Sequence, residues 1–201
     1  MNNITLKNKN LDPDFIGSFL IEPLSLCDDI IDHFEANKDR QTRGHVGGGL
    51  HDRHKNSTDM TLLPKEINMP GNEIFLSYFN ELLCCYTHYV SQWPFLEKFD
   101  NKIDIGKFNI QRYHTGQHFQ TIHTERASLG TLHRVFAWMT YLNDVDVEEG
   151  GSTHFTHYDM EVQPKKGLTL IWPAEWTHAH RGNKMHSGTK YIMTGWMHFS
   201  E

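Results

Sequence analysis

The sequence is poor in cysteine and contains no long apolar run. Its 201 residues include three cysteines, which are Cys27 and the adjacent pair Cys84 and Cys85, so no CxxC motif is present. This usage argues against a disulfide framework and a thiolate zinc site, and the three are expected to be small core residues. No segment approaches the roughly 18 apolar residues of a membrane span, and the first residues lack the apolar core of a signal peptide. We therefore expect a cytoplasmic protein without a membrane partner.

A basic excess is missing as well. The formal net charge is -6, whereas nucleic-acid binders usually carry a basic surface, so no nucleic-acid partner is expected. The glycine-rich stretch at 44–49 lacks the Gly-Lys-Ser/Thr ending of a P-loop and does not indicate nucleotide binding. With 38% hydrophobic and 12% aromatic residues, the chain can bury a sizeable core. We predict a single domain over residues 1–201, with helical support in 1–100 and a core barrel in 101–201.

The first hundred residues are predicted to form two helices and a loop. The segment 25–38 has the period of a short amphipathic helix, with Ser25 as its candidate N-cap. A longer helix is predicted from Asn72, because apolar residues recur at spacings of three and four until Pro94 stops it. The intervening segment 41–59 is rich in glycine, histidine and charge. It is predicted to be a loop that either faces the substrate or is a plain surface excursion.

From residue 103 onward, strand-like runs alternate with turn signals at the spacing of a sandwich or barrel. Glycine and proline supply the turns at 148–151 and 164–167. The candidate strands are 102–114, 118–123, 134–143, 153–163, 168–173 and 190–199. This pattern favours a mainly β fold with flanking α-helices, built as a two-layer antiparallel structure, over a parallel βαβ sheet.

A candidate metal site begins at His123 and Glu125. Side chains at i and i+2 of an extended backbone point the same way, so these two can share one ion. A third ligand is best supplied by His178 or His180, in a loop expected at a sheet edge after the strand 168–173. Two histidines and one carboxylate occupy one face of an octahedral ion and leave the opposite positions open, as in non-haem Fe(II) oxygenases. A structural zinc site would instead close with four protein ligands, usually including thiolates.

Seven sequence blocks in fixed order carry a family resemblance. They are RYHTGQHF, HTE, RVFAWMTYLNDV, EEGGSTHF, VQPKKGLTLIWP, HRGNKMHSGTKY and GWMHF, over about residues 103–199. This series resembles the prolyl 4-hydroxylase group of Fe(II)- and 2-oxoglutarate-dependent dioxygenases. The resemblance implies a double-stranded β-helix, a cupin-like jelly roll whose open end holds the iron.

The resemblance also assigns the metal ligands. It implies His123 and Glu125 as the His-x-Asp/Glu pair, with Glu where Asp is more usual. It implies His180 as the third ligand, because the family's distal histidine stands about ten residues before a basic residue, here Lys190. His178 is kept as a neighbouring or substrate-facing group.

The same resemblance assigns a 2-oxoglutarate site. Lys190 would pair with the distal carboxylate of 2-oxoglutarate, and Tyr141 and Thr153 would complete its hydrogen bonds. Tyr113 would line the cofactor pocket. Arg134 begins a strand whose alternation sets it opposite Tyr141, so only a bulge would bring both to one pocket. The implied cofactors are Fe(II), 2-oxoglutarate and O2, with ascorbate as a supporting reductant.

The implied reaction is hydroxylation of a substrate C–H bond with release of succinate and CO2. The resemblance favours a prolyl residue in a peptide or protein, although a free amino acid or a small metabolite would use the same core. Two other functions stay open. A metal-binding, cupin-like protein that is not an oxygenase would keep the three ligands and have no use for Lys190, and a binding module would carry a degenerate site.

Overall fold

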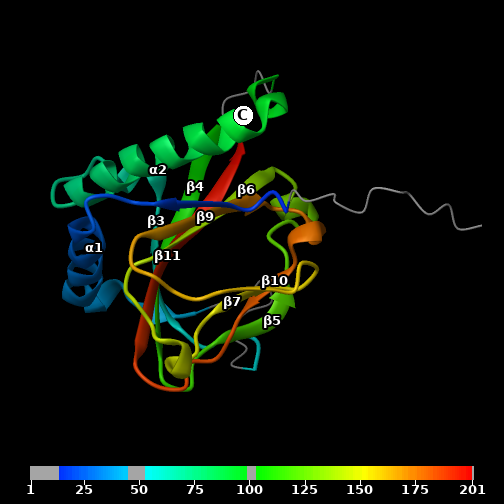
Figure 1. Ribbon diagram of the computed structural model, residues 1–201. Helices are drawn as coiled ribbons and strands as arrows, with labels where there is room; N and C mark the ends of the chain where they lie inside the picture. Colours follow the sequence, from blue (N-terminus) through cyan, green and yellow to red (C-terminus); the bar gives the residue numbers. More distant parts are fainter. Residues whose placement is uncertain (1–13, 45–52, 99–102, 201) are drawn as a thin grey trace, which may run out of the picture.

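The computed structural model describes residues 14–44, 53–98 and 103–200, and its strands form two antiparallel sheets (Figure 1). The larger sheet has seven strands in the order β1-β9-β6-β11-β4-β3-β2, and the smaller has four in the order β5-β10-β7-β8. The strands of the larger sheet are β1 (Gly17–Leu20), β2 (Thr42–Arg43), β3 (Thr58–Leu62), β4 (Ile103–His114), β6 (Arg134–Tyr141), β9 (Leu168–Pro173) and β11 (Thr189–Phe199). Those of the smaller sheet are β5 (Phe119–His123), β7 (Thr153–Phe155), β8 (Met160–Val162) and β10 (His180–Gly182). The predicted mainly β fold with flanking helices is confirmed.

Two helices cover one face of the larger sheet, away from the smaller sheet (Figure 1). They are α1 (Ser25–Ala36) and α2 (Glu73–Gln92), and α2 ends just before Pro94 as predicted. Asn72 occupies the N-cap position of α2 but makes no side-chain cap bond, and Ser25 is not the N-cap of α1. Ser25 lies inside the first turn of α1 and makes no side-chain cap bond, and the Asn72 side chain instead donates to the backbone carbonyl of Glu66 at 2.8 Å. Neither helix is long and apolar enough to cross a membrane, among the residues described.

The alternation of β6 separates two cores. Phe136 and Trp138 pack with α1 and α2 in a core on the helical side of the larger sheet. Ala137, Met139 and Tyr141 pack on the other side, in a second core between the two sheets. Because a one-residue slip would exchange these faces, the apolar residues on both sides fix the register of the strand. A large cleft opens from the space between the two sheets.

Several elements differ from the sequence prediction. The predicted strand 153–163 is a hairpin of β7 and β8. The predicted loop 41–59 contains β2 and the start of β3, while its part 45–52 lies outside the described residues. His180 opens strand β10 and is not in a loop. Cys84 is exposed, in contrast to the buried Cys27 and Cys85. Short strands such as β10 escape sequence patterns because they are fixed by pairing with distant partners.

Candidate active site

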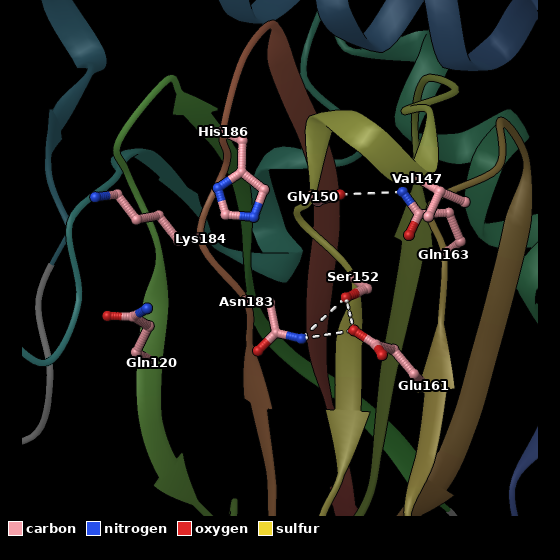
Figure 2. A pocket seen from close by; sticks show the side chains of 9 residues that line it. All are labelled: Gln120, Val147, Gly150, Ser152, Glu161, Gln163, Asn183, Lys184 and His186. Carbon is pink, nitrogen blue, oxygen red and sulfur yellow. Dashed lines mark hydrogen bonds between the residues drawn. The ribbon is translucent and has the colours of Figure 1, made fainter.

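One cavity of the described chain is not a candidate for metal chemistry. It has a volume of about 470 Å³ and is lined by residues of β5, β8 and neighbouring loops (Figure 2). Three of its polar side chains are hydrogen-bonded to one another. Asn183 donates to Ser152 Oγ at 3.0 Å and to Glu161 Oε1 at 2.8 Å, and Ser152 also donates to Glu161. Within the described chain, a cluster of potential metal ligands is found only in another, larger cavity.

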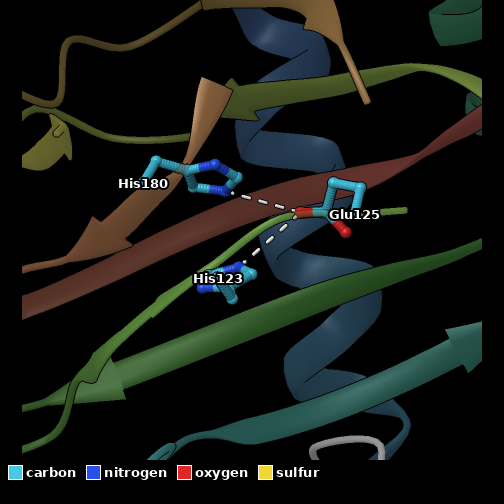
Figure 3. Close-up of side chains that lie close together, drawn as sticks. All are labelled: His123, Glu125 and His180. Carbon is cyan, nitrogen blue, oxygen red and sulfur yellow. Dashed lines mark ion pairs between the residues drawn. The ribbon is translucent and has the colours of Figure 1, made fainter. Parts of the chain in front are cut away.

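The larger cavity is a cleft of about 860 Å³ that reaches between the two sheets. Three potential metal ligands meet in it: His123 at the end of β5, Glu125 two residues on, and His180 at the start of β10. Their ligand atoms all lie within 4.8 Å of one another (Figure 3). Strand pairing explains the meeting, because His180 and His123 are direct partners in the antiparallel pair of β10 and β5. The pairing brings together residues that are far apart in sequence.

Backbone carbonyls set the tautomers of both histidines. His123 Nδ1 donates to the carbonyl of Thr121 at 2.8 Å, and His180 Nδ1 donates to the carbonyl of His178 at 2.9 Å. A carbonyl oxygen only accepts, so each Nδ1 carries a proton. Each Nε2 faces Glu125 and is the nitrogen that would bind a metal, releasing any proton it holds. The two Nε2 atoms lie 3.6 and 3.4 Å from Glu125 Oε1. The three donors are therefore aimed at one point.

The second oxygen of Glu125 is held by the neighbouring sheet. Trp196 Nε1 donates to Glu125 Oε2 at 2.6 Å. Arg134 lies 3.7 Å above the Trp196 ring and donates to the Glu125 backbone carbonyl at 2.9 Å. Burial alone would raise the pKa of Glu125, but hydrogen bonds and charges from His123 and His180 outweigh burial and hold this pKa well below its usual value. An ionised carboxylate and two imidazole nitrogens fit Fe(II) with open positions on the opposite side.

Replacing Trp196 with phenylalanine is expected to weaken metal binding without removing a ligand. Because groups that orient a ligating carboxylate typically contribute about 10- to 100-fold to metal affinity, we expect a loss of this size in W196F. Competitive titration with Co²⁺ measures it. Trp138→Phe is the matched control, since Trp138 is fully buried in the helical-side core and its indole nitrogen has no hydrogen-bond partner among the described residues. Equal Co²⁺ affinity in both variants would contradict the role given to Trp196.

His178 faces away from the cluster. Its side chain is 3% exposed, and its Nε2 lies 2.8 Å from the carbonyl of Asp14 and 3.3 Å from the Tyr158 hydroxyl. The residues alone leave His178 and His180 as alternatives for the third ligand, and the family resemblance favours His180. The fold brings His180 to the pair, and His178 contributes its backbone carbonyl to the orientation of the His180 ring.

Lys190 is a buried amine in the same cleft. It is 3% exposed, and its Nζ donates to the carbonyl of Gly151 at 2.6 Å and lies 4.8 Å from the centre of the Tyr113 ring. Gly151 is required there, because a Cβ would lie 2.3 Å from Met185 Sδ and its φ is +72°. Burial lowers the pKa of Lys190 to about 7. Within the described chain Lys190 forms no ion pair, so the cleft holds a cation that lacks an anionic partner.

The other predicted cofactor residues surround Lys190. Tyr113 is its direct partner across β4 and β11, and Tyr113 and Thr153 both line the cleft. Tyr141 is fully buried, and its hydroxyl donates to Thr153 Oγ1 at 2.7 Å. Thr153 therefore keeps its own hydroxyl proton for a ligand. Arg134 also lines the cleft. Regular alternation along β6 would place it on the face opposite Tyr141, but the pairing of β6 with β11 shifts register between Met197 and His198. This irregularity allows Arg134 to lie on the cleft side.

Two features of the cleft are not predicted from the sequence. Trp196 follows Lys190 by six residues on β11, and this even spacing could have placed both on one face of the strand. The second feature is a buried ion pair between Lys55 Nζ and Asp59 Oδ2, at 2.6 Å. It comes from the glycine- and charge-rich segment, where no local pattern distinguishes a buried charge from an exposed one.

Comparison with known proteins agrees with this geometry. Residues 108–198 match the family model of the 2OG-Fe(II) oxygenase superfamily. The chain is 30% identical over 77 residues to prolyl 4-hydroxylase subunit alpha-1 of Gallus gallus, covering 35% of this chain and 14% of that protein. It is 43% identical over 53 residues to procollagen-lysine,2-oxoglutarate 5-dioxygenase 1 of Bos taurus, covering 25% of this chain and 7% of that protein. These matches span a small part of each curated relative.

The overall fold is also similar to that of solved prolyl hydroxylases. It superposes on the 2OG complex of a viral collagen prolyl hydroxylase from Paramecium Bursaria Chlorella virus-1 with a TM-score of 0.66, at 17% identity, covering 93% of this chain and 97% of that one. The double-stranded β-helix predicted from the sequence is thereby confirmed. The fold is thus that of the solved prolyl hydroxylases, and residues 108–198 are similar to the 2OG-Fe(II) oxygenase superfamily. The family carries in its name the two cofactors, Fe(II) and 2-oxoglutarate, that the sequence predicts.

Proposed function

We propose that this protein hydroxylates a substrate C–H bond in a reaction that consumes O2 and 2-oxoglutarate and releases succinate and CO2. One observation carries the proposal: the two-histidine, one-carboxylate cluster shares its cleft with Lys190, a buried cation without an acidic partner. A buried charge is costly unless it is paired, and the distal carboxylate of 2-oxoglutarate supplies the partner. A cupin-like metal protein that does not bind 2-oxoglutarate would have no acidic ligand to offset the cost of burying this cation.

The residues of the cleft are proposed to bind the iron and 2-oxoglutarate and to orient them. His123, Glu125 and His180 would hold the iron through Nε2, Oε1 and Nε2. Iron with 2-oxoglutarate bound supplies the oxidising chemistry, and no side chain has to act as a general base. Lys190 would bind the distal carboxylate, and Thr153, fixed by the Tyr141 hydroxyl, would donate a second hydrogen bond.

Two further groups shape the same cleft. The Tyr113 hydroxyl donates to Gln111 Oε1 at 2.6 Å, which fixes the ring beneath the Lys190 ammonium. Met139 and Ile192 add apolar surface to the lining and limit the access of water to the reacting centre. Tyr113 is thus proposed to line the cofactor pocket.

A prolyl residue in a peptide or protein is the substrate that we propose. The support is the names of the relatives, which include a prolyl 4-hydroxylase subunit and a collagen prolyl hydroxylase. The lysine dioxygenase relative makes a lysyl residue the second candidate, and a free amino acid would use the same core. Thr42, His54 and Lys55 flank the undescribed part of segment 41–59 and line the cleft, which supports a substrate-facing role for this segment.

An anaerobic titration tests the proposed reaction. Adding 2-oxoglutarate to the Fe(II)-loaded protein is expected to give the weak visible charge-transfer band of a chelated 2-oxo acid, and admitting oxygen is expected to give succinate. Wild-type protein that loads iron but shows neither band nor succinate would favour the cupin-like alternative. A screen of prolyl, lysyl and free amino-acid substrates for stimulated succinate release would then define the substrate. Cytoplasmic location, support by ascorbate and the single-domain organisation of residues 1–201 stay predictions.

A further inference from the structure

The cleft carries a positive excess in an acidic protein. Whereas the whole chain has a net charge of -6, the described charged side chains that line the cleft are four cations and two carboxylates, leaving histidines aside. They are Lys55, Lys107, Arg134, Lys190, Asp59 and Glu125. A charge of one sign gathered in a cleft raises the local concentration of ligands of the opposite sign.

Most of these charges already have partners, if the proposed function is right. Lys55 pairs with Asp59, and Lys190 would pair with the distal carboxylate of 2-oxoglutarate. The ferrous ion would be neutralised by Glu125 and by the other carboxylate of 2-oxoglutarate. Lys107 is then left over, because it forms no ion pair within the described chain. Arg134 lies 3.7 Å from Glu125 Oε2, and with that carboxylate assigned to the metal the charge of Arg134 is balanced only in part.

Lys107 and Arg134 lie on either side of Trp196. Strand order places β11 between β4 and β6. Trp196 pairs with Ala137 of β6, and its neighbours Gly195 and Met197 pair with Phe108 and Ile105 of β4, so Lys107 lies at the register shift beside it. Lys107 is exposed, and the Arg134 guanidinium covers the Trp196 ring at 3.7 Å. Trp196 in turn bonds to Glu125, which places this cationic pair next to the metal-ligand cluster.

The rest of this region is polar. Thr61, Asn109 and Thr194 face the cleft on three strands, and Thr61 Oγ1 donates to Asn109 Oδ1 at 2.7 Å. Hydroxyl and amide groups of this kind solvate a carboxylate and do not form an apolar pocket. The lining therefore suits an anionic group more than an aliphatic side chain.

We infer that Lys107 and Arg134 bind a carboxylate of the substrate beside the C–H bond to be hydroxylated. This inference rests on the proposed function and narrows its substrate class. The carboxylate has two sources with the same chemistry: an acidic side chain next to the target residue of a peptide, or the α-carboxylate of a free amino acid.

Binding to the protein loaded with Zn²⁺ and 2-oxoglutarate, which does not turn over, tests the inference independently of the reaction. The probes are acetyl-Gly-Glu-Pro-Gly-amide, its Gln and Lys analogues, L-proline and L-prolinamide, titrated by ligand-observed NMR in low salt with saturating 2-oxoglutarate and Zn²⁺. We expect the Glu peptide or L-proline to bind about three- to tenfold more tightly than its uncharged analogue, with the difference shrinking as salt is added. Preference for the Glu peptide alone identifies a peptide substrate, and preference for L-proline alone identifies a free amino acid.

Lys107→Gln is expected to remove most of this preference, whereas Lys165→Gln keeps it. Lys165 is the matched control because it is exposed and lies outside the cleft. Equal affinity for every charged and uncharged pair, tightest binding of the Lys peptide, or a preference unchanged in K107Q would overturn the inference. Succinate release separates the two proposals. Carboxylate preference without succinate would count against the oxygenase reaction alone, and succinate without preference would count against the carboxylate site alone.

Discussion

Replacing Lys190 with methionine is expected to abolish 2-oxoglutarate binding and, at the same time, to stabilise the ligand-free protein. The loss of affinity follows from leaving the distal carboxylate buried without its cation, which costs about 3–5 kcal/mol, or at least about 100-fold in Kd. Titration of the anaerobic Fe(II) protein by the charge-transfer band measures this loss. An undiminished band in K190M would show that another group anchors the cofactor.

The gain in stability follows from the pKa of Lys190. Burial lowers this pKa to about 7, whereas a lysine in the unfolded chain has a pKa of about 10.4. Between these values the unfolded state binds more protons, so the free energy of unfolding of the wild type rises with pH across this window. K190M lacks the group and should not show this rise. Below pH 7 we expect K190M to be more stable by on the order of a few kcal/mol.

Lys55→Met is the matched control for stability. Lys55 is also a buried lysine of the cleft, but its Nζ lies 2.6 Å from Asp59 Oδ2. Removing it leaves a buried carboxylate unpaired, so K55M is expected to lose about 3–5 kcal/mol. Chemical denaturation between pH 6 and 10.5 compares the variants. Destabilisation of K190M at low pH, similar to that of K55M, would show that Lys190 has a partner within the protein.

Replacing His180 with alanine is expected to remove iron from the protein, whereas His178→Ala keeps it. His180 Nε2 is one of the three donors within 4.8 Å of one another. With two donors left, we expect iron affinity to fall by at least about 100-fold, since outer-shell groups alone contribute 10- to 100-fold. Iron content after anaerobic reconstitution and desalting measures the difference.

His178→Ala is the control because the two histidines lie so close together. Its imidazole bonds to the Asp14 carbonyl and touches the Tyr158 ring, so the variant should lose about 1–3 kcal/mol of stability. Its backbone carbonyl remains to orient His180. Loss of iron from H178A alone would assign the third ligand to His178 and contradict the assignment made here.

The sequence predicted much of the fold because its strongest patterns are local. The spacing of apolar residues predicted α2 and its end before Pro94, and the alternation in 134–143 predicted β6. The hairpin of β7 and β8 and the strand β10 were predicted less well. These short strands have three residues each, too few for a period, and their pairing with distant strands decides them.

Local patterns predicted which kinds of side chain meet at the site. His123 and Glu125 share a face by their spacing on one strand, and the order of the family's blocks indicated Lys190. Only the tertiary structure decided between His178 and His180, because pairing of β10 with β5 turns one imidazole into the cleft and the other toward Asp14. It also decided that Trp196 holds Glu125. Such contacts join segments that are far apart in the chain, and their geometry exists only after both sheets have packed.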